Sequence, residues 1–510
     1  MHPIFTPLLL LAPLLLGCTS SSWTTFRQNR QHHGFSSSTV SPKLKKFGYL
    51  TGNGVTSSPA LSKDGLTMYV GSWDTYLHAI DLTTGKRKWR YKTDSNINGS
   101  PAIHPSGHTI YIGSYDHYLY AIDAATGVLK WKYETQNWVH SSPAVLSDGS
   151  VIFVGSLDGQ MHCINNNDGS KNFTYNTGDE IWSSPVLSYD ENTLYWGSYD
   201  NFVHATDLWN IHSKQEGEER LKRFYKWEYA TEGGVYSSPS LSPDGSVLYV
   251  GSFDTYLHAI SAADGLGKWK FKTDGFIHSS PTVSGDGNTI YIGSNDLYIY
   301  AVDASTGKEK WKYKTGGAVA ASPALSADGK TLYVGSADSI IYAINTIDGT
   351  KKWLYHTLTG YIVDSSPAIL GKWIYIGSSD SAVYAIEDKD WRGDGKCTLW
   401  FVWFVWFVWL FGSFGSFGSW SLFGMTRVLL FLTFCCSCNM FFCFPGALDQ
   451  SFFGNGPCFE DCVTKRNATV ARNTSLWLLK DSGVVDTVGN SVGVKWLWLL
   501  EMVVGGVLFL

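Results

Sequence analysis

Residues that could act as acids, bases or metal ligands recur at a fixed spacing through most of this chain. An aspartate occurs eight times, as Asp74, Asp116, Asp158, Asp200, Asp254, Asp296, Asp338 and Asp380. Four residues later stands a histidine in four copies (His78, His162, His204 and His258) and a tyrosine in the others (Tyr120, Tyr300, Tyr342 and Tyr384). Carboxylate and imidazole groups can transfer protons or bind a metal, provided that several of them converge on one point.

The spacing of these residues argues against convergence. Each copy supplies one Asp and one His or Tyr, so the groups are distributed evenly along the chain. A short Asp side chain also fixes a turn by bonding the backbone two residues ahead. We therefore interpret the aspartates as turn formers and the histidines as packing residues. The sequence gives no set of catalytic residues and no metal ligands.

The recurring unit is a repeat of about 42 residues, which is the signature of a repeat architecture. A Ser-Pro step marks its start at Pro59, Pro101, Pro143, Pro185, Pro239, Pro281, Pro323 and Pro367, at intervals of 42, 42, 42, 54, 42, 42 and 44 residues. Each copy contains four short segments of β-branched and aromatic residues separated by Asp- and Gly-containing turns. Eight such units predict an all-β fold, an eight-bladed β-propeller of four-stranded antiparallel blades over residues 44–391.

The two ends of the repeat region complement each other. The last copy lacks its fourth strand, and residues 44–51 match the fourth strand of the other copies. We expect this N-terminal strand to complete the eighth blade and close the ring, which leaves no open sheet edge between the first and last blades. The fourth strands also share an aromatic residue that we expect between the blades, namely Phe47, Trp89, Trp131, Phe173, Trp227, Trp269, Trp311 and Trp353.

The position just before each Ser-Ser-Pro strand varies most between copies. We expect these residues to form a ring at one mouth of the central channel, because every blade presents the same position there. A mixed polar and aromatic ring is typical of recognition sites, although loops that nothing constrains would vary in the same way. The candidate binding residues are Thr56, Asn98, His140, Trp182, Tyr236, His278 and Asp364, with Ala320 completing the ring.

The repeats resemble the pyrroloquinoline-quinone-like (PQQ-like) repeat family. Its pattern YVGSxDxxLYAIDAxTGxxxWxxxT recurs nearly intact at 69–93, 111–135, 249–273, 291–315 and 333–357. The resemblance implies a propeller from one of two branches. One branch comprises quinoprotein alcohol dehydrogenases, which hold the quinone and calcium in the central funnel. The other comprises non-enzymatic scaffolds of the BamB type.

The residues favour the non-enzymatic branch. The enzymes place a vicinal cysteine pair over the quinone, and the only adjacent pair here, Cys435-Cys436, lies beyond the repeats. The enzymes also carry long insertions, whereas most of these blades keep to 42 residues. We expect a non-catalytic scaffold with an unknown protein partner and no confident cofactor. The alternatives are a PQQ- and calcium-dependent dehydrogenase, or a relic of one, and a secreted carbohydrate or peptide binder.

The segments outside the repeats indicate the cellular compartment in which the protein resides. Residues 1–18 carry the apolar run of a signal peptide, and Leu15-Leu16-Gly17-Cys18 resembles a bacterial lipidation box with Cys18 as the lipidated residue. We therefore expect an extracytoplasmic protein, which is secreted, periplasmic or membrane-anchored. Residues 19–43 are polar. Residues 392–510 form an apolar, Cys-rich tail that either attaches to a membrane, through the run 428–444, or is a non-native translation product.

The remaining features concern partners. The formal net charge is −5, so the chain has no basic footprint for nucleic acid. A closed propeller is expected to be monomeric. Blade four carries an insertion at 208–222, which we interpret either as a tolerated surface loop or as a partner site.

Overall fold

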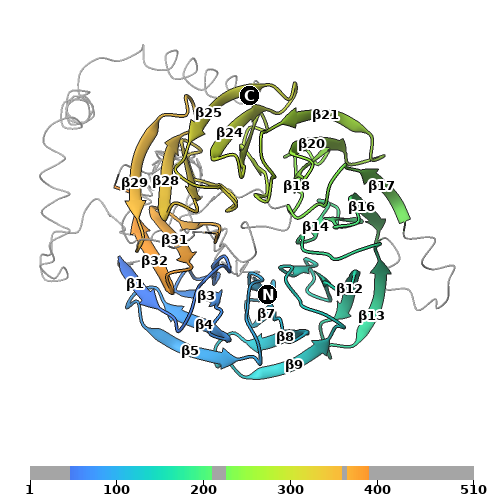
Figure 1. The fold of residues 1–510 in the computed structure, drawn as a ribbon. Helices are drawn as coiled ribbons and strands as arrows, with labels where there is room; N and C mark the ends of the chain where they lie inside the picture. Colours follow the sequence, from blue (N-terminus) through green and yellow to red (C-terminus); the bar gives the residue numbers. More distant parts are fainter. Residues whose placement is uncertain (1–45, 209–224, 359–363, 390–510) are drawn as a thin grey trace, which may run out of the picture. The chain divides into compact units, whose positions relative to one another are not determined.

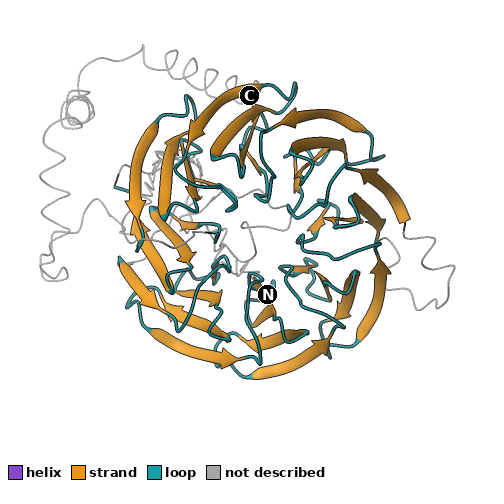
Figure 2. Cartoon of the chain, in the orientation of Figure 1, coloured by secondary structure: helices purple, strands orange, loops and turns teal. Residues whose placement is uncertain are grey.

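The structure is a computed structural model that describes residues 46–208, 225–358 and 364–389 (Figure 1). These residues form eight four-stranded antiparallel sheets arranged around a central axis. Figure 2 shows only strands and loops in the described part of the chain. The predicted all-β, eight-bladed propeller is thus confirmed. Three features predicted outside the blades lie beyond the described residues: residues 1–43 with Cys18, nearly all of the insertion 208–222, and the tail 392–510.

Each blade runs from an inner first strand to an outer fourth strand. We number the blades from the one that begins with β2. The first strands are β2 (Ala60–Leu61), β6 (Ala102–Ile103), β10 (Ala144–Val145), β14 (Val186–Leu187), β18 (Ser240–Leu241), β22 (Thr282–Val283), β26 (Ala324–Leu325) and β30 (Ala368–Leu370). The second strands are β3 (Thr67–Gly71), β7 (Thr109–Gly113), β11 (Val151–Gly155), β15 (Thr193–Gly197), β19 (Val247–Gly251), β23 (Thr289–Gly293), β27 (Thr331–Gly335) and β31 (Trp373–Ser378).

The third and fourth strands complete the blades. The third strands are β4 (Tyr76–Asp81), β8 (Tyr118–Asp123), β12 (Gln160–Asn165), β16 (Phe202–Asp207), β20 (Tyr256–Ser261), β24 (Tyr298–Asp303), β28 (Ile340–Asn345) and β32 (Ala382–Glu387). The fourth strands are β5 (Arg87–Lys92), β9 (Leu129–Glu134), β13 (Lys171–Asn176), β17 (Tyr225–Ala230), β21 (Gly267–Lys272), β25 (Glu309–Lys314), β29 (Lys351–His356) and β1 (Phe47–Leu50).

The burial of each strand follows its place in the blade. The second strands are buried along nearly their whole length, as in β7 and β23, because both of their faces pack against neighbouring blades. The fourth strands are buried on one face only. In β25, Trp311 and Tyr313 point inward while Lys310 and Lys312 are exposed. This alternation is what a half-buried strand requires.

The N-terminal strand closes the ring. β1 pairs antiparallel with β32, with Phe47 opposite Ala385 and Leu50 opposite Ala382. The strand order of blade eight is therefore β1-β32-β31-β30, so the start of the propeller completes its last blade. The predicted closure is confirmed.

The shared aromatic residue of the fourth strands reaches the following blade. The indole Nε1 of Trp311 donates to the carbonyl oxygen of Thr346 at 3.0 Å, and Trp89 bonds Ala124 in the same way at 3.1 Å. Trp131, Trp227 and Trp269 also donate to a carbonyl oxygen of the next blade. Trp353 donates instead to the carboxylate of Asp388. Phe47 and Phe173 occupy the place without a donor; Phe47 lies against Gly85, and Phe173 is buried.

A ring of serines joins all eight blades beside the channel. The backbone N–H of the serine before the repeated proline donates to the hydroxyl oxygen of the corresponding serine in the next blade, at 2.9–3.0 Å. The sequence of donors is Ser58, Ser100, Ser142, Ser184, Ser238, Ser280, Ser322 and Ser366, which donates back to Ser58. All eight are buried. The Ser-Pro step therefore carries a structural hydrogen bond as well as marking the repeat.

Replacing Ser280 by alanine should lower the free energy of unfolding by about 1–3 kcal/mol, because the buried N–H of Ser238 loses the hydroxyl oxygen that accepts its hydrogen bond. Urea unfolding of the full chain measures the change. Ser305→Ala is the matched control, since Ser305 is an exposed turn residue, and it should change the free energy by less than about 0.5 kcal/mol. Equal effects of the two substitutions would contradict the structural role of the serine ring.

Candidate functional site

Two sets of loops lie together at one end of the channel. The first set leads from each fourth strand into the next first strand; these lead-in loops are 51–58, 93–100, 135–142, 177–184, 231–238, 273–280, 315–322 and the described part of the eighth, 357–358 with 364–366. The second set contains the repeated aspartates; these aspartate turns are 72–75, 114–117, 156–159, 198–201, 252–255, 294–297, 336–339 and 378–381. Together they form what we call the mouth face.

Each repeated aspartate ties a lead-in loop to its blade. The carboxylate of Asp74 accepts hydrogen bonds from the backbone N–H of Tyr76 at 3.0 Å and of Gly52 at 2.8 Å. Burial would raise the pKa of Asp74, but hydrogen bonds from His78 and Gly52 outweigh it and hold the pKa below its ordinary value. The same balance lowers the pKa of Asp158, Asp200 and Asp254. The aspartates therefore form the turns that the sequence suggested, and the four with a lowered pKa are ionised at neutral pH.

The repeated histidines bond as well as pack. His78 Nε2 lies 3.0 Å from Asp74 Oδ2, while Nδ1 lies 3.0 Å from the hydroxyl of Tyr49 in the preceding blade. His162 bonds Tyr133 at 3.1 Å, and His258 bonds Tyr229 at 3.2 Å. In tyrosine-bearing blades the phenol bonds the aspartate directly, as Tyr120 bonds Asp116 at 2.8 Å. Our interpretation of the histidines missed this bridge between blades.

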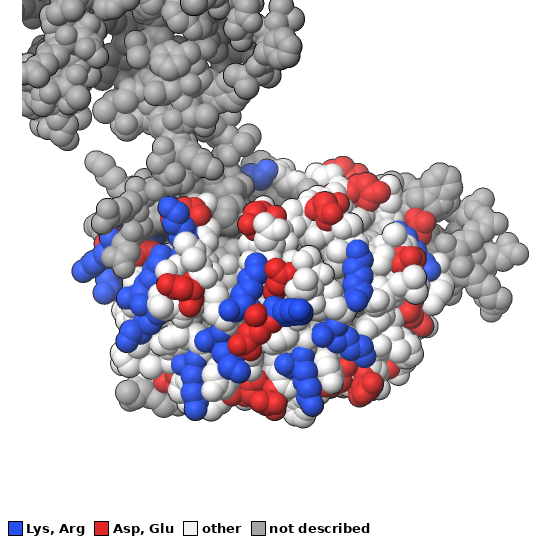
Figure 3. All heavy atoms as spheres, turned by 90° about the horizontal axis from the view of Figure 1, so that it is seen from above, with Lys and Arg blue, Asp and Glu red and all other residues white. Residues whose placement is uncertain are grey.

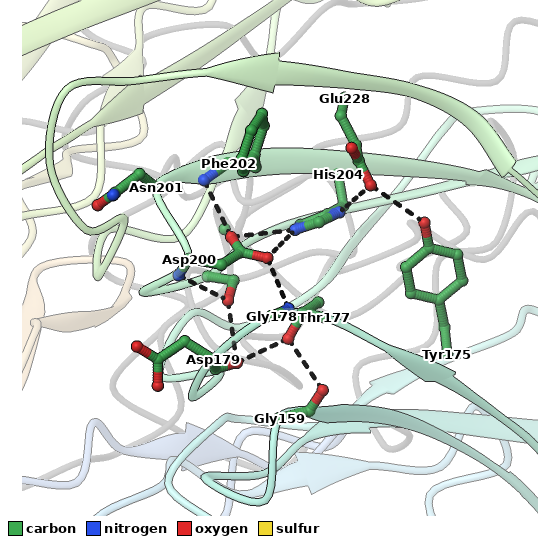
Figure 4. A network of polar contacts seen from close by, with 12 residues as sticks. Gly159, Tyr175, Thr177, Gly178, Asp179, Asp200, Asn201, Phe202, His204 and Glu228 are labelled. Carbon is green, nitrogen blue, oxygen red and sulfur yellow. Dashed lines mark hydrogen bonds and ion pairs between the residues drawn. The ribbon is translucent and has the colours of Figure 1, made fainter.

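Blade four departs from this pattern (Figure 4). His204 Nε2 lies 2.9 Å from Asp200 Oδ2, and its Nδ1 lies 3.2 Å from Glu228 Oε1. The hydroxyl of Tyr175 donates to Glu228 at 3.4 Å instead of bonding the histidine. The imidazole also stacks on Trp196 at 5.4 Å between ring centroids. The cluster joins the outer strands of blades three and four, so we assign it a structural role.

The described part of the chain contains no cluster of side chains that could bind a metal ion. Across residues 46–208, 225–358 and 364–389, no three His, Cys, Asp or Glu side chains come together as a metal site. The vicinal pair Cys435-Cys436 lies outside those ranges. Within the same ranges, no helix is long and apolar enough to cross a membrane.

The structure places the eight predicted ring residues at equivalent positions of the lead-in loops, and all eight are half-buried. Thr56 Oγ1 donates to Asn98 Oδ1 at 2.9 Å. His140 and Tyr236 belong to blades three and five, yet the phenol of Tyr236 lies 3.1 Å from His140 Nε2. Trp182, from the blade between, lies 4.7 Å from His140 and 5.5 Å from Tyr236 by ring centroids.

A second set of aromatic residues adjoins this ring, and our sequence analysis did not single it out. Tyr115 stands directly before a turn aspartate and stacks on Trp138 at 4.3 Å. Phe253 holds the same place in blade five and stacks on Phe276 at 5.2 Å. The signal was available, because the residue before the turn aspartate also varies between repeats: Trp73, Tyr115, Leu157, Tyr199, Phe253, Asn295, Ala337 and Ser379.

These side chains make one continuous feature, which we call the aromatic arc. It comprises Trp73, Tyr115, Trp138, His140, Trp182, Tyr199, Tyr236, Phe253, Phe276 and His278, which belong to blades one to six and their lead-in loops. Blades seven and eight present Ala318, Ala320, Ala337, Asp364 and Ser379 instead. The arc is partly open to solvent, with exposed fractions of 36% for Trp73, 41% for Trp138 and 51% for Phe276.

Burial sets the charge states of titratable groups in the arc and in the gap that blades seven and eight leave in it. Desolvation lowers the pKa of His140 to about 4, so the imidazole is neutral at pH 7 and can accept the hydrogen bond of Tyr236. Desolvation raises the pKa of Asp364 to about 6. At pH 7 the gap in the arc therefore contains a carboxylate held at an energetic cost.

Comparison with known proteins places this architecture in a family. A family model described as "Outer membrane protein assembly factor BamB" matches residues 37–147, 74–218 and 279–392. The chain belongs to this family of PQQ-like repeat propellers. No curated protein matches the chain.

Solved structures share the fold of this PQQ-like propeller. BamB from Moraxella catarrhalis is 18% identical with a TM-score of 0.55, and the match covers 68% of this chain and 100% of BamB. The computationally designed Ika8 protein is 15% identical with a TM-score of 0.55, and the match covers 66% of this chain and 98% of Ika8. At these identities the likeness concerns the fold.

Proposed function

We propose that this PQQ-like propeller is a non-catalytic scaffold that binds a protein partner through the aromatic arc in an extracytoplasmic compartment. The observation that carries the proposal is the arc itself, a set of partly exposed aromatic side chains around the channel mouth. Membership of a family described by an outer-membrane assembly factor supports a binding role outside the cytoplasm. The proposal includes attachment of the chain to a membrane through a lipid on Cys18, as the sequence predicts.

The arc has the physical properties of an interface. Aromatic side chains contribute large apolar areas at low conformational cost and dominate the binding energy of many interfaces. Trp138 and Phe276 are each backed by a stacked partner, Tyr115 and Phe253, so that they present a rigid face to solvent. Exposed aromatic faces that are already ordered lose little entropy when a partner covers them.

A photo-crosslinking residue placed at Trp138 or Phe276 of the full chain should yield discrete protein adducts in cells. The control positions are Leu266 and Ile347, which are 67% and 79% exposed in turns at the opposite end of the channel. We expect no discrete adducts from the controls, because the proposed interface is confined to the mouth face. Equal adducts from both ends, or none from the arc, would refute the proposed function.

A further inference from the structure

The described part of the mouth face carries acidic side chains without Lys or Arg, whereas the outer strands of the blades carry both signs of charge. Its lead-in loops and aspartate turns contain no Lys or Arg among the described residues. They carry the eight turn aspartates together with Asp94, Asp179, Glu180, Glu232, Asp274 and Asp364. The nearest cations along the chain are Lys92, Lys272 and Lys314, at the ends of outer strands. On the side of the propeller drawn in Figure 3, Lys and Arg are instead interspersed with acidic residues.

The acidic groups of the mouth face are available to a ligand as charge. Asp94, Asp179, Glu232 and Asp274 are exposed beside the arc. Hydrogen bonds stabilise the ionised form of four turn aspartates and lower their pKa, so these four remain negative, namely Asp74, Asp158, Asp200 and Asp254. Charges of one sign around a channel mouth add to a potential that attracts ligands of the opposite sign. An anionic partner would be repelled at this face.

The aromatic arc and the acidic loops favour the same ligand. Ammonium and guanidinium groups bind over the faces of Trp, Tyr and Phe, and Arg also stacks on such rings. Asp364 is half-buried, and no hydrogen bond or ion pair joins it to another residue of the described ranges. Burial accordingly raises its pKa. A ligand cation in the gap of the arc would supply that partner. A neutral carbohydrate would use the aromatic faces but would leave the one-sided charge without a role.

We infer that the aromatic arc binds an extended segment of a protein that carries several arginine or lysine side chains. The cations stack on the exposed faces of Trp73, Trp138 and Phe276 and pair with the acids of the lead-in loops. Asp364, beside the small residues of blades seven and eight, receives a cation that enters the channel mouth. This inference deepens the proposed function and rests on it.

Calorimetry on the full chain tests the inference with a short synthetic peptide that contains several arginines. The matched peptide has citrulline in place of each arginine, which keeps the shape and removes the charge. We expect the arginine peptide to bind at least about 10-fold more tightly than the citrulline peptide, with affinity that falls as salt is raised. Trp138→Ala and Asp364→Asn should each weaken binding by about 10-fold, whereas Ile347→Ala should leave it unchanged.

Three results would overturn the inference: equal binding of the citrulline peptide, unchanged binding in Trp138→Ala, or saturable binding of a neutral oligosaccharide in place of the peptide. The crosslinking experiment separates this failure from that of the proposed function. Adducts at Trp138 or Phe276 without arginine preference would leave a scaffold whose partner has a different chemistry. Loss of both signals would remove the scaffold proposal together with the inference.

Discussion

Replacing Trp311 by alanine should lower the free energy of unfolding by about 3–5 kcal/mol, the range typical of large aromatic truncations in a core. Trp311 is only 9% exposed and lies between blades six and seven. A Cβ on Gly349 of the next blade would lie 2.8 Å from Trp311 Cδ2, so the ring packs directly on a glycine at φ +72°. The substitution opens a cavity there and removes the donor to the Thr346 carbonyl. Urea and thermal unfolding of the full chain measure the loss.

Trp311→Phe is the matched control for this prediction. Phe47 and Phe173 occupy the same place in two other blades, so the position accepts a phenyl ring. The control loses the indole hydrogen bond and part of the buried area, and we expect it to cost about 1–2 kcal/mol. If the alanine variant were no less stable than the phenylalanine variant, Trp311 would not be filling the space between the blades.

The fold could be predicted because each local signal is repeated eight times. The Ser-Pro step, the turn aspartate and the outer Trp fix the strand order within a blade, and the match of 44–51 to a fourth strand fixes the closure. The period also predicts which residues hold equivalent positions, which is why the ring from Thr56 to Asp364 could be named from sequence. The period carries no information on how far each side chain reaches.

The contacts between blades were the part that sequence reasoning missed. His140 and Tyr236 are 96 residues apart and meet because both side chains reach toward the channel past the blade that separates them. The serine ring was overlooked for a different reason. A buried N–H needs an acceptor, but the sequence does not say that the acceptor is the hydroxyl of a serine one repeat away. Such bonds depend on the spacing of adjacent blades in three dimensions.

Asp364→Asn should raise the free energy of unfolding by about 2 kcal/mol at neutral pH while weakening the binding of cations. Moving a carboxyl pKa from 3.8 to about 6 corresponds to at most about 3 kcal/mol, and partial exposure reduces that figure. Because its pKa is raised by folding, the folded chain binds more protons than the unfolded chain between about pH 4 and pH 6. The free energy of unfolding of the wild type therefore falls by this amount as the pH rises through that window, whereas the asparagine variant has no such fall.

Unfolding curves across pH 4 to 8 provide the measurement, roughly the window that the linkage relation defines. The two proteins should have similar stability near pH 4 and should diverge up to about pH 6, with the variant more stable. His140 has the opposite slope in this range, since burial lowers its pKa to about 4, but it is present in both proteins and cancels in the difference. Tyr236 is the titratable neighbour that Asp364 influences, and its pKa is raised far above neutral pH. A constant difference at all pH values would contradict a buried, ionised Asp364.

The two effects of Asp364→Asn together decide what this carboxylate is for. The Asp364 carboxylate destabilises the fold and has no bonded partner in the described chain. A ligand cation that pairs with it would explain why a buried charge stands at this position. Such a ligand should stabilise the wild type by an amount that rises with the logarithm of its concentration above the dissociation constant, and the asparagine variant much less. Adding the arginine peptide should therefore narrow the gap in melting temperature between the two proteins above about pH 6, where Asp364 is ionised, and leave it unchanged near pH 4. An equal shift of both proteins at both pH values would place the peptide elsewhere on the molecule.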